Sequence, residues 1–244
     1  MTDSDIYMGV KLRLLKRGED RMTYSLPSVK MLSEKLVDSL EWPEDKPILA
    51  LRFPPQKAPK GAPILDMVSR RKYLCRTTYI GTKRNIPAGD VDADRYGLKL
   101  APFLSREEYG KVYLRTYAAD FLKPFRDYQE KGYKKENKEY FEKEFPNTKG
   151  ISVRKDGRVV GMLSMMHMPE NGRAYRPLSW IAWLWVDGRL PKEERKAAHG
   201  LLGNWLKKLP GKYFGGAIHA VNLKSQNWFI RMGARPVQIF FLRR

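Results

Sequence analysis

Residues 179–206, SWIAWLWVDGRLPKEERKAAHGLLGNWL, decide the fold. The stretch opens on an apolar run with three tryptophans, which predicts a strand over Leu178–Val186. From about Glu193 to Leu209 the apolar residues recur at helical spacing, so a helix that packs on a sheet should follow. A helix that starts directly after a strand presents backbone N–H groups where a diphosphate can be held.

Further elements are expected on both sides of this stretch. Ser105-Arg106-Glu107-Glu108 is a capping box that opens a helix, and Asp156-Gly157 is a two-residue hairpin turn. The order of strands and helices along the chain predicts an α/β (α+β) fold with three layers and a central mixed, mostly antiparallel sheet. The predicted strands are Leu98–Phe103, Ile151–Arg154, Val159–Met168, Phe214–Val221 and Gln238–Leu242, and the predicted helices run to about Tyr117, over Phe121–Phe145 and over Leu223–Met232.

Residues 1–94 form an N-terminal extension in this reading, and residues 95–244 form the main domain. The extension contains no motif that carries chemistry, so its role stays open. Its predicted elements are strands at Gly9–Leu15, Ile48–Phe53 and Tyr73–Ile80 and a helical stretch over Val29–Leu40, with a proline-rich connector at 54–63.

The chain has 244 residues and a formal net charge of +20, and its last fifty residues contain ten Lys or Arg and no Asp or Glu. Such a charge attracts polyanions, which include nucleic acid and acidic proteins. A single cysteine, Cys75, excludes an internal disulfide framework and a cysteine zinc site. We expect no membrane span, because no apolar run is long enough, and a cytoplasmic protein.

The stretch from about Gly97 to Leu242 resembles the GNAT superfamily of acyl-CoA-dependent N-acyltransferases. The family motif Q/R-x-x-G-x-G/A is matched by Arg195-x-x-Ala198-x-Gly200, with Ala198 where glycine is usual. The resemblance implies acetyl-CoA or another acyl-CoA as co-substrate, no metal, and phosphate contacts from the motif. The residues concerned are Arg195, Lys196, Ala197, Ala198, His199 and Gly200.

A second family pattern follows the fifth strand of the predicted domain. The spacing from Asn222 through Ser225 to Gly233 is preserved. The resemblance implies that Asn222 and Ser225 cap a helix and contact the pantetheine arm of the cofactor. It also implies that the strand edge near Leu184 and Val186 pairs with the amides of that arm.

The groups that move protons are harder to assign. Phe229 stands where many relatives have the tyrosine that protonates the departing thiolate. Either the thiolate leaves unassisted or through water, with Ser225 or Tyr213 as weaker donors, or the chain does not catalyse transfer. The strand 179–186 contains no carboxylate that could serve as a base. His167, Glu170, Asp187 and His219 are the available groups, and His219 is the candidate base.

Two functions follow from these observations. The first is an N-acyltransferase that moves an acetyl or other acyl group from acyl-CoA to a primary amine, with an acidic acceptor favoured by the charge. The alternative is a catalytically degenerate GNAT-fold protein that binds nucleic acid or has a phage virion or host-interaction role. The tryptophans of the strand and helices are assigned to core packing rather than to an acceptor pocket or base stacking.

Overall fold

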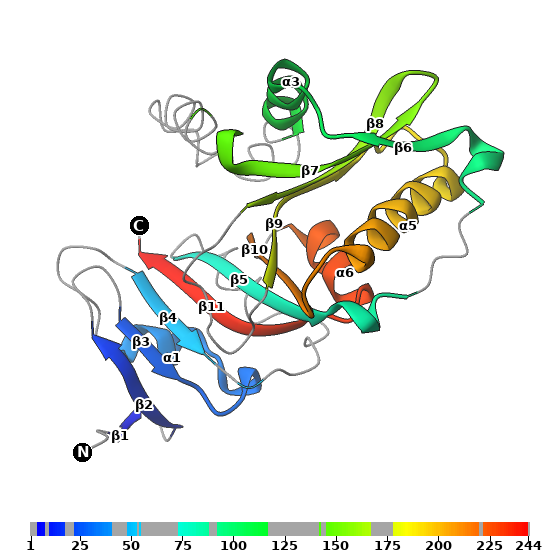
Figure 1. Ribbon diagram of the computed structural model, residues 1–244. Helices are drawn as coiled ribbons and strands as arrows, with labels where there is room; N and C mark the ends of the chain where they lie inside the picture. Colours follow the sequence, from blue (N-terminus) through cyan, green and yellow to red (C-terminus); the bar gives the residue numbers. More distant parts are fainter. Residues whose placement is uncertain are drawn as a thin grey trace. The chain divides into compact units, whose positions relative to one another are not determined.

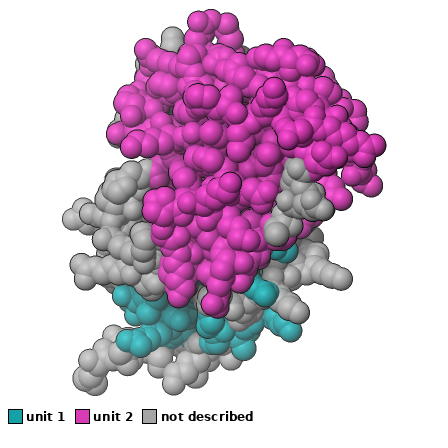
Figure 2. Space-filling model, turned by 45° about the vertical axis from the view of Figure 1, so that its right-hand side comes forward, with its two compact units in different colours: residues 1–81, 216–230, 234–244 teal, residues 82–215, 231–233 magenta. Residues whose placement is uncertain are grey.

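The computed structural model describes residues 4–7, 10–17, 22–40, 48–52, 54, 73–87, 92–116, 142, 145–166, 178–219 and 222–243. These residues form a mixed α+β fold (Figure 1). The chain groups by its internal contacts into two compact units, coloured separately in Figure 2. Unit 1 comprises residues 1–81, 216–230 and 234–244, and unit 2 comprises residues 82–215 and 231–233.

The sheet of unit 1 joins strands from the two ends of the chain. Its strand order is β1-β2-β3-β4-β11-β5. Strands β3 and β4 are parallel, whereas β11 is antiparallel to both β4 and β5, so the sheet is mixed. The bounds are β1 Ser4–Tyr7, β2 Val10–Arg17, β3 Met22–Ser25, β4 Ile48–Arg52, β5 Tyr73–Thr82 and β11 Arg235–Arg243.

One face of this sheet forms the core of unit 1. Helix α1 (Glu34–Ser39) is capped by Ser33, whose Oγ accepts from the Leu36 N–H at 3.2 Å, and a 3-10 turn (η1, Val29–Met31) precedes it. Leu36 and Val37 are buried against alternate residues of the strands, because successive strand side chains point to opposite faces. The strand residues in this core are Leu12, Met22, Tyr24, Leu49, Leu51, Cys75, Ile239 and Phe241.

Helix α6 (Leu223–Arg231) belongs to unit 1 for all but its last residue. Its buried residues are Trp228 and Phe229, and the Phe229 ring lies 6.0 Å from that of Tyr79. Gly233 ends the helix with φ of +80°, a backbone angle that favours glycine.

The sheet of unit 2 is an antiparallel meander followed by one parallel strand. Strands β6 (Leu98–Pro102), β7 (Thr148–Lys155), β8 (Arg158–Met166) and β9 (Leu178–Val186) pair in sequence order, and β10 (Tyr213–His219) starts parallel to β9. The predicted hairpin is confirmed: Asp156 and Gly157 have φ of 49° and 74° between β7 and β8.

Helices cover the two faces of the unit 2 sheet, as Figure 1 shows for α3 (Arg106–Thr116) and α5 (Lys192–Lys208). Tyr109 of α3 reaches Ser164 with its hydroxyl at 3.2 Å, whereas α5 packs on β6–β9 through buried Ala198, Leu202 and Leu206. The result is a three-layer unit. Short 3-10 turns lie at Lys83–Asn85 (η2), Asp94–Tyr96 (η3) and Phe145–Asn147 (η6).

The capping box is confirmed as well. The Ser105 amide donates to Glu108 Oε2, and the Glu108 amide donates to Ser105 Oγ, both at 3.2 Å. This reciprocal pair satisfies two donors that a helix start leaves without partners.

The structure differs from the predicted elements in the helical stretch Val29–Leu40 and in two strands that were not predicted. The helical stretch Val29–Leu40 is only a 3-10 turn and the six residues of α1, because Ser33 supplies a new N-cap inside it. Strands β1 and β3 were not predicted, since four residues show too little alternation. Most of Phe121–Phe145 and of the proline-rich connector lies outside the described residues.

The division into an extension of residues 1–94 and a domain of residues 95–244 stays a prediction. Among the helices in the described ranges, none has the length and apolar character needed to cross a bilayer.

Candidate functional site

The predicted diphosphate site begins at the first turn of α5. This helix starts at Lys192. Its N-cap is Pro191, whose side chain makes no capping hydrogen bond to the first amides of the helix. The Arg195 amide donates to the Pro191 carbonyl at 2.9 Å, so it is the first amide of the intrahelical ladder. The N–H groups left for a ligand are therefore those of Lys192, Glu193 and Glu194. The sequence had assigned the free amides to the motif that starts at Arg195, three residues after Lys192.

The side chain of Arg195 is turned toward the loop that precedes the helix. Its Nη1 donates to the carbonyl of Gly188 at 2.8 Å and to that of Leu190 at 2.7 Å. These bonds satisfy two carbonyls and fix the course of the loop between β9 and α5. Arg195 therefore fixes the loop that enters the helix, while Lys196 is 82% exposed and its Nζ lies 3.9 Å from Glu193 Oε2.

Two acidic residues share the first turn of α5. Glu193 and Glu194 complement the positive end of the helix dipole, and Glu194 Oε2 accepts from Lys155 Nζ at 2.8 Å. A diphosphate at this turn has to compete with these carboxylates. Lys155 and Lys196 compensate for them in part.

The remaining motif residues lie inside the helix. Ala197 and Ala198 are buried against the sheet, and Gly200 is half-buried. His199 is half-buried: burial, then the positive charges of Arg231 and Arg195, lower its pKa to about 4. Its Nδ1 is buried and has no hydrogen-bond partner among the described residues. His199 is therefore a neutral imidazole at neutral pH.

Strands β9 and β10 pair only over the first three residues of each, and both strands continue past this ladder. The ladder between β9 and β10 covers Leu178–Trp180 and Tyr213–Gly215. Strand β9 continues for six more residues to Val186, where the loop to α5 begins. Leu184 and Val186, the predicted partners of the pantetheine amides, lie in this extension and are half-buried. The extension and the first turn of α5 both belong to unit 2.

The other predicted site residues belong to unit 1. Asn222 is the N-cap of α6, because its Oδ1 accepts from the Ser225 amide at 3.1 Å, so the predicted capping is confirmed. Ser225 is half-buried in the first turn. His219 is the last residue of β10. Contact of Asn222 and Ser225 with a cofactor and the role of His219 as the base stay predictions.

Phe229 is a core residue of unit 1. It is 3% exposed and packs between Trp228 and Tyr79. The Tyr79 hydroxyl donates to Gln226 Oε1 at 2.9 Å, and burial raises the pKa of Tyr79 to about 12. A buried phenyl ring at this position supplies no proton to a leaving thiolate.

Asp187 is unsuited to act as the base. Hydrogen bonds from Arg189 and the charges of Arg189 and Arg158 lower the pKa of its carboxyl to about 2, despite burial. His167 and Glu170 lie outside the described residues. The sequence analysis did not identify Arg158 and Arg189 as functional residues. The available signal was Asp187 directly after a strand, with Arg189 two residues later.

Among the described residues no group of three or more His, Cys, Asp or Glu is placed to hold a metal.

No protein-family model matches the chain, and a search of curated proteins gives no match. Solved structures similar to the chain include GNAT acetyltransferases. A GCN5-related N-acetyltransferase from Kribbella flavida is 12% identical, with 99% of this chain and 89% of that chain covered and a TM-score of 0.44.

Two other solved structures are similar at the same level of identity. A tandem GNAT protein from the clavulanic acid biosynthesis pathway is 12% identical, with 95% and 78% covered and a TM-score of 0.46. A functionally unknown conserved protein from Staphylococcus epidermidis is 12% identical, with 99% and 94% covered and a TM-score of 0.48.

Proposed function

We propose that this protein is a GNAT-type N-acyltransferase that moves an acetyl or other acyl group from acyl-CoA to a primary amine. The observation that supports it best is the extension of β9 beyond its three-residue parallel ladder with β10, which leads directly into the start of α5. Beyond the ladder with β10, β9 pairs with β8 on one edge, and the main-chain groups of its other edge can bind an extended amide-bearing ligand. A helix N-terminus then receives the diphosphate at the far end of the same ligand.

In this proposal the residues of the chain have separate tasks. Leu184 and Val186 pair through their main chains with the pantetheine amides. The amides of Lys192, Glu193 and Glu194 bind the diphosphate, with Lys196 adding charge at the first turn; the motif from Ala197 to Gly200 supports this turn from inside the helix.

The chemical step is direct attack of the neutral amine on the thioester carbonyl. A carbon–nitrogen bond forms, the carbon–sulfur bond breaks, and the amine proton passes to a base. His219 is the proposed base, and Ser225 is the proposed donor to the thiolate, because Phe229 has no proton to give. No metal takes part in this proposal, and an acidic acceptor suits the charge of +20.

Calorimetric titration with acetyl-CoA tests the binding half of the proposal. Lys192→Pro removes one N–H from the first helical position, where proline is tolerated because Pro191 before it is extended, with ψ of 153°. Lys192→Ala removes the same side chain and keeps the N–H. We expect Lys192→Pro to bind about tenfold more weakly than Lys192→Ala. Equal affinities of the two variants contradict the diphosphate site, and no heat with millimolar acetyl-CoA contradicts the proposal as a whole.

Release of free thiol from acetyl-CoA in the presence of primary amines tests the catalytic half. His219→Gln should slow the release without loss of acetyl-CoA binding, and Ser225→Ala should slow it as well. A wild-type protein that binds acetyl-CoA and acylates no amine, peptide or tRNA-bound amine supports the degenerate alternative. Burial of Phe229 at the usual tyrosine position is the observation that favours that alternative.

A further inference from the structure

Asp187 of unit 2 holds two arginines in place. Its side chain is only 5% exposed, and its amide donates to the Val160 carbonyl at 2.8 Å, which anchors the residue to β8. Arg189 donates to the carboxylate through Nε at 3.0 Å and through Nη2 at 2.7 Å, and Arg158 donates through Nη2 at 2.8 Å. A buried carboxylate thus fixes the positions of both guanidinium groups.

The two guanidinium groups keep donors for a further anion. The side chains of Arg158 and Arg189 are 59% and 63% exposed. Arg158 Nε and Nη1 and Arg189 Nη1 have no hydrogen-bond acceptor among the described residues. With Asp187, the group carries one net positive charge. Its remaining N–H groups suit one singly charged oxyanion, because guanidinium groups match carboxylate and phosphate oxygens in geometry.

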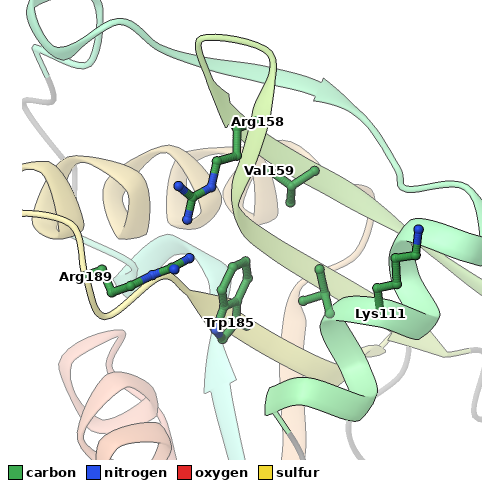
Figure 3. Close-up of a pocket in the computed structure, with 6 residues that line it drawn as sticks. Lys111, Arg158, Val159, Trp185 and Arg189 are labelled. Atoms are coloured by element: carbon green, nitrogen blue, oxygen red, sulfur yellow. The ribbon is translucent and has the colours of Figure 1, made fainter.

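A pocket of about 130 Å³ adjoins this pair (Figure 3). In Figure 3, Arg158 and Arg189 point toward the space beside the Trp185 ring, while the Lys111 side chain runs along α3. Lys111, whose Nζ forms an ion pair with Glu107, also lines the pocket. Its lining residues are Lys111, Val112, Arg158, Val159, Trp185 and Arg189, without a carboxylate among them.

An irregularity in β8 creates the apolar side of the pocket. Val153 of β7 pairs with Gly161 of β8, and the next residue, Arg154, pairs with Val159. Val160 of β8 therefore has no pairing partner on β7 and forms a bulge. Such a bulge turns the side chain before it to the other face of the sheet. Val159 therefore joins Trp185 and the α3 residue Val112 on one side of the sheet.

We propose that this pocket binds a singly charged oxyanion carried on a small apolar group, either a carboxylate or a phosphodiester. Arg158 and Arg189 bind the anion, and Trp185, Val112 and Val159 contact the apolar group. Asp187 is a positioning residue, since it acts only through the arginines. The proposal goes beyond the acyl transfer proposed above and does not rest on it.

The test is a ligand-observed NMR titration of the full chain, without acyl-CoA. The probes are sodium benzoate for the carboxylate, diethyl phosphate for the phosphodiester, and benzyl alcohol as the uncharged match for benzoate. We expect at least one of the two anions to bind with a dissociation constant of about 1–10 mM. Binding of only one of them identifies the chemistry of the natural ligand. Equal binding of benzyl alcohol and benzoate overturns the proposal, because the arginines would then select nothing.

Two kinds of variant locate the binding. Arg158→Gln should weaken anion binding about tenfold, whereas Lys99→Gln, which removes one exposed charge elsewhere in unit 2, should leave it unchanged. Val112→Trp fills the pocket from α3 and leaves Asp187 and both arginines intact, so it should abolish binding in a folded protein. Failure of both anions to bind, or binding that persists in Val112→Trp, overturns the proposal.

Discussion

The substitution Asp187→Asn tests whether the carboxylate that holds Arg158 and Arg189 stabilises the fold. The pKa of Asp187 falls from 3.8 to about 2, chiefly through its hydrogen bonds from Arg189. By linkage a shift of this size corresponds to about 2.4 kcal/mol. Because both guanidinium groups are more than half exposed, solvent screens the interaction. We therefore expect Asp187→Asn to lower the free energy of unfolding by about 1–2 kcal/mol at pH 7.

The pH dependence gives the sign of the effect. The folded pKa of Asp187 lies below the unfolded value, so the unfolded chain binds more protons between about pH 4 and pH 2. The contribution of Asp187 is complete above pH 4 and is lost as the pH falls toward 2. The difference in stability between the wild type and Asp187→Asn should shrink over this range, while acid effects common to both proteins cancel.

Urea unfolding at a series of pH values measures this difference. Asp156→Asn is the control: it removes an aspartate from the exposed turn between β7 and β8, where asparagine tolerates the positive φ of 49°. Its effect should stay within about 0.5 kcal/mol. A stability difference for Asp187→Asn that is constant from pH 7 to pH 2 would refute the reasoning, as would a variant as stable as the wild type at pH 7.

Three further substitutions test the scaffold by urea unfolding. Lys83→Met removes the Nζ that donates to two carbonyls at the end of α5 and should cost about 1–2 kcal/mol, whereas Lys207→Met, which loses one bond at 3.4 Å, should cost less than about 0.5 kcal/mol. Gly150→Ala places a Cβ against the backbone oxygen of Leu163 in β8 and should lower the free energy of unfolding by about 1–3 kcal/mol. Gly188→Ala, whose Cβ meets open space, is the control, and equal costs for the two would contradict the close approach at Gly150. Asn222→Ala should cost about 1 kcal/mol through the lost cap of α6, and an unchanged midpoint would show that the cap is dispensable.

Local patterns in the sequence predicted most elements of unit 2. The apolar run over Leu178–Val186 is β9 to the residue, and α5 begins one residue before the predicted Glu193. These predictions succeeded because a capping box, a hairpin turn and an amphipathic period are each determined within about four neighbouring residues.

Features that depend on distant partners were not predictable in the same way. The pairing of β11 with both β4 and β5 joins residues far apart in the chain. The Arg158 contact to Asp187 depends on the register between β7 and β8. That register shifts at Val160, which has no partner on β7. The motif starting at Arg195 was assigned free amides, yet a helix that begins at Lys192 already uses the Arg195 amide.

The position of β11 has a consequence for how the chain is made. During synthesis β4 and β5 leave the ribosome long before Arg235–Arg243, so neither strand can pair with β11 until those residues have been made. Residues 82–215, which hold most of unit 2, emerge earlier and contain its four-strand meander. Unfinished chains should therefore expose the edges of β4 and β5, and ribosome-bound fragments that stop before β11 should be the species most in need of a chaperone.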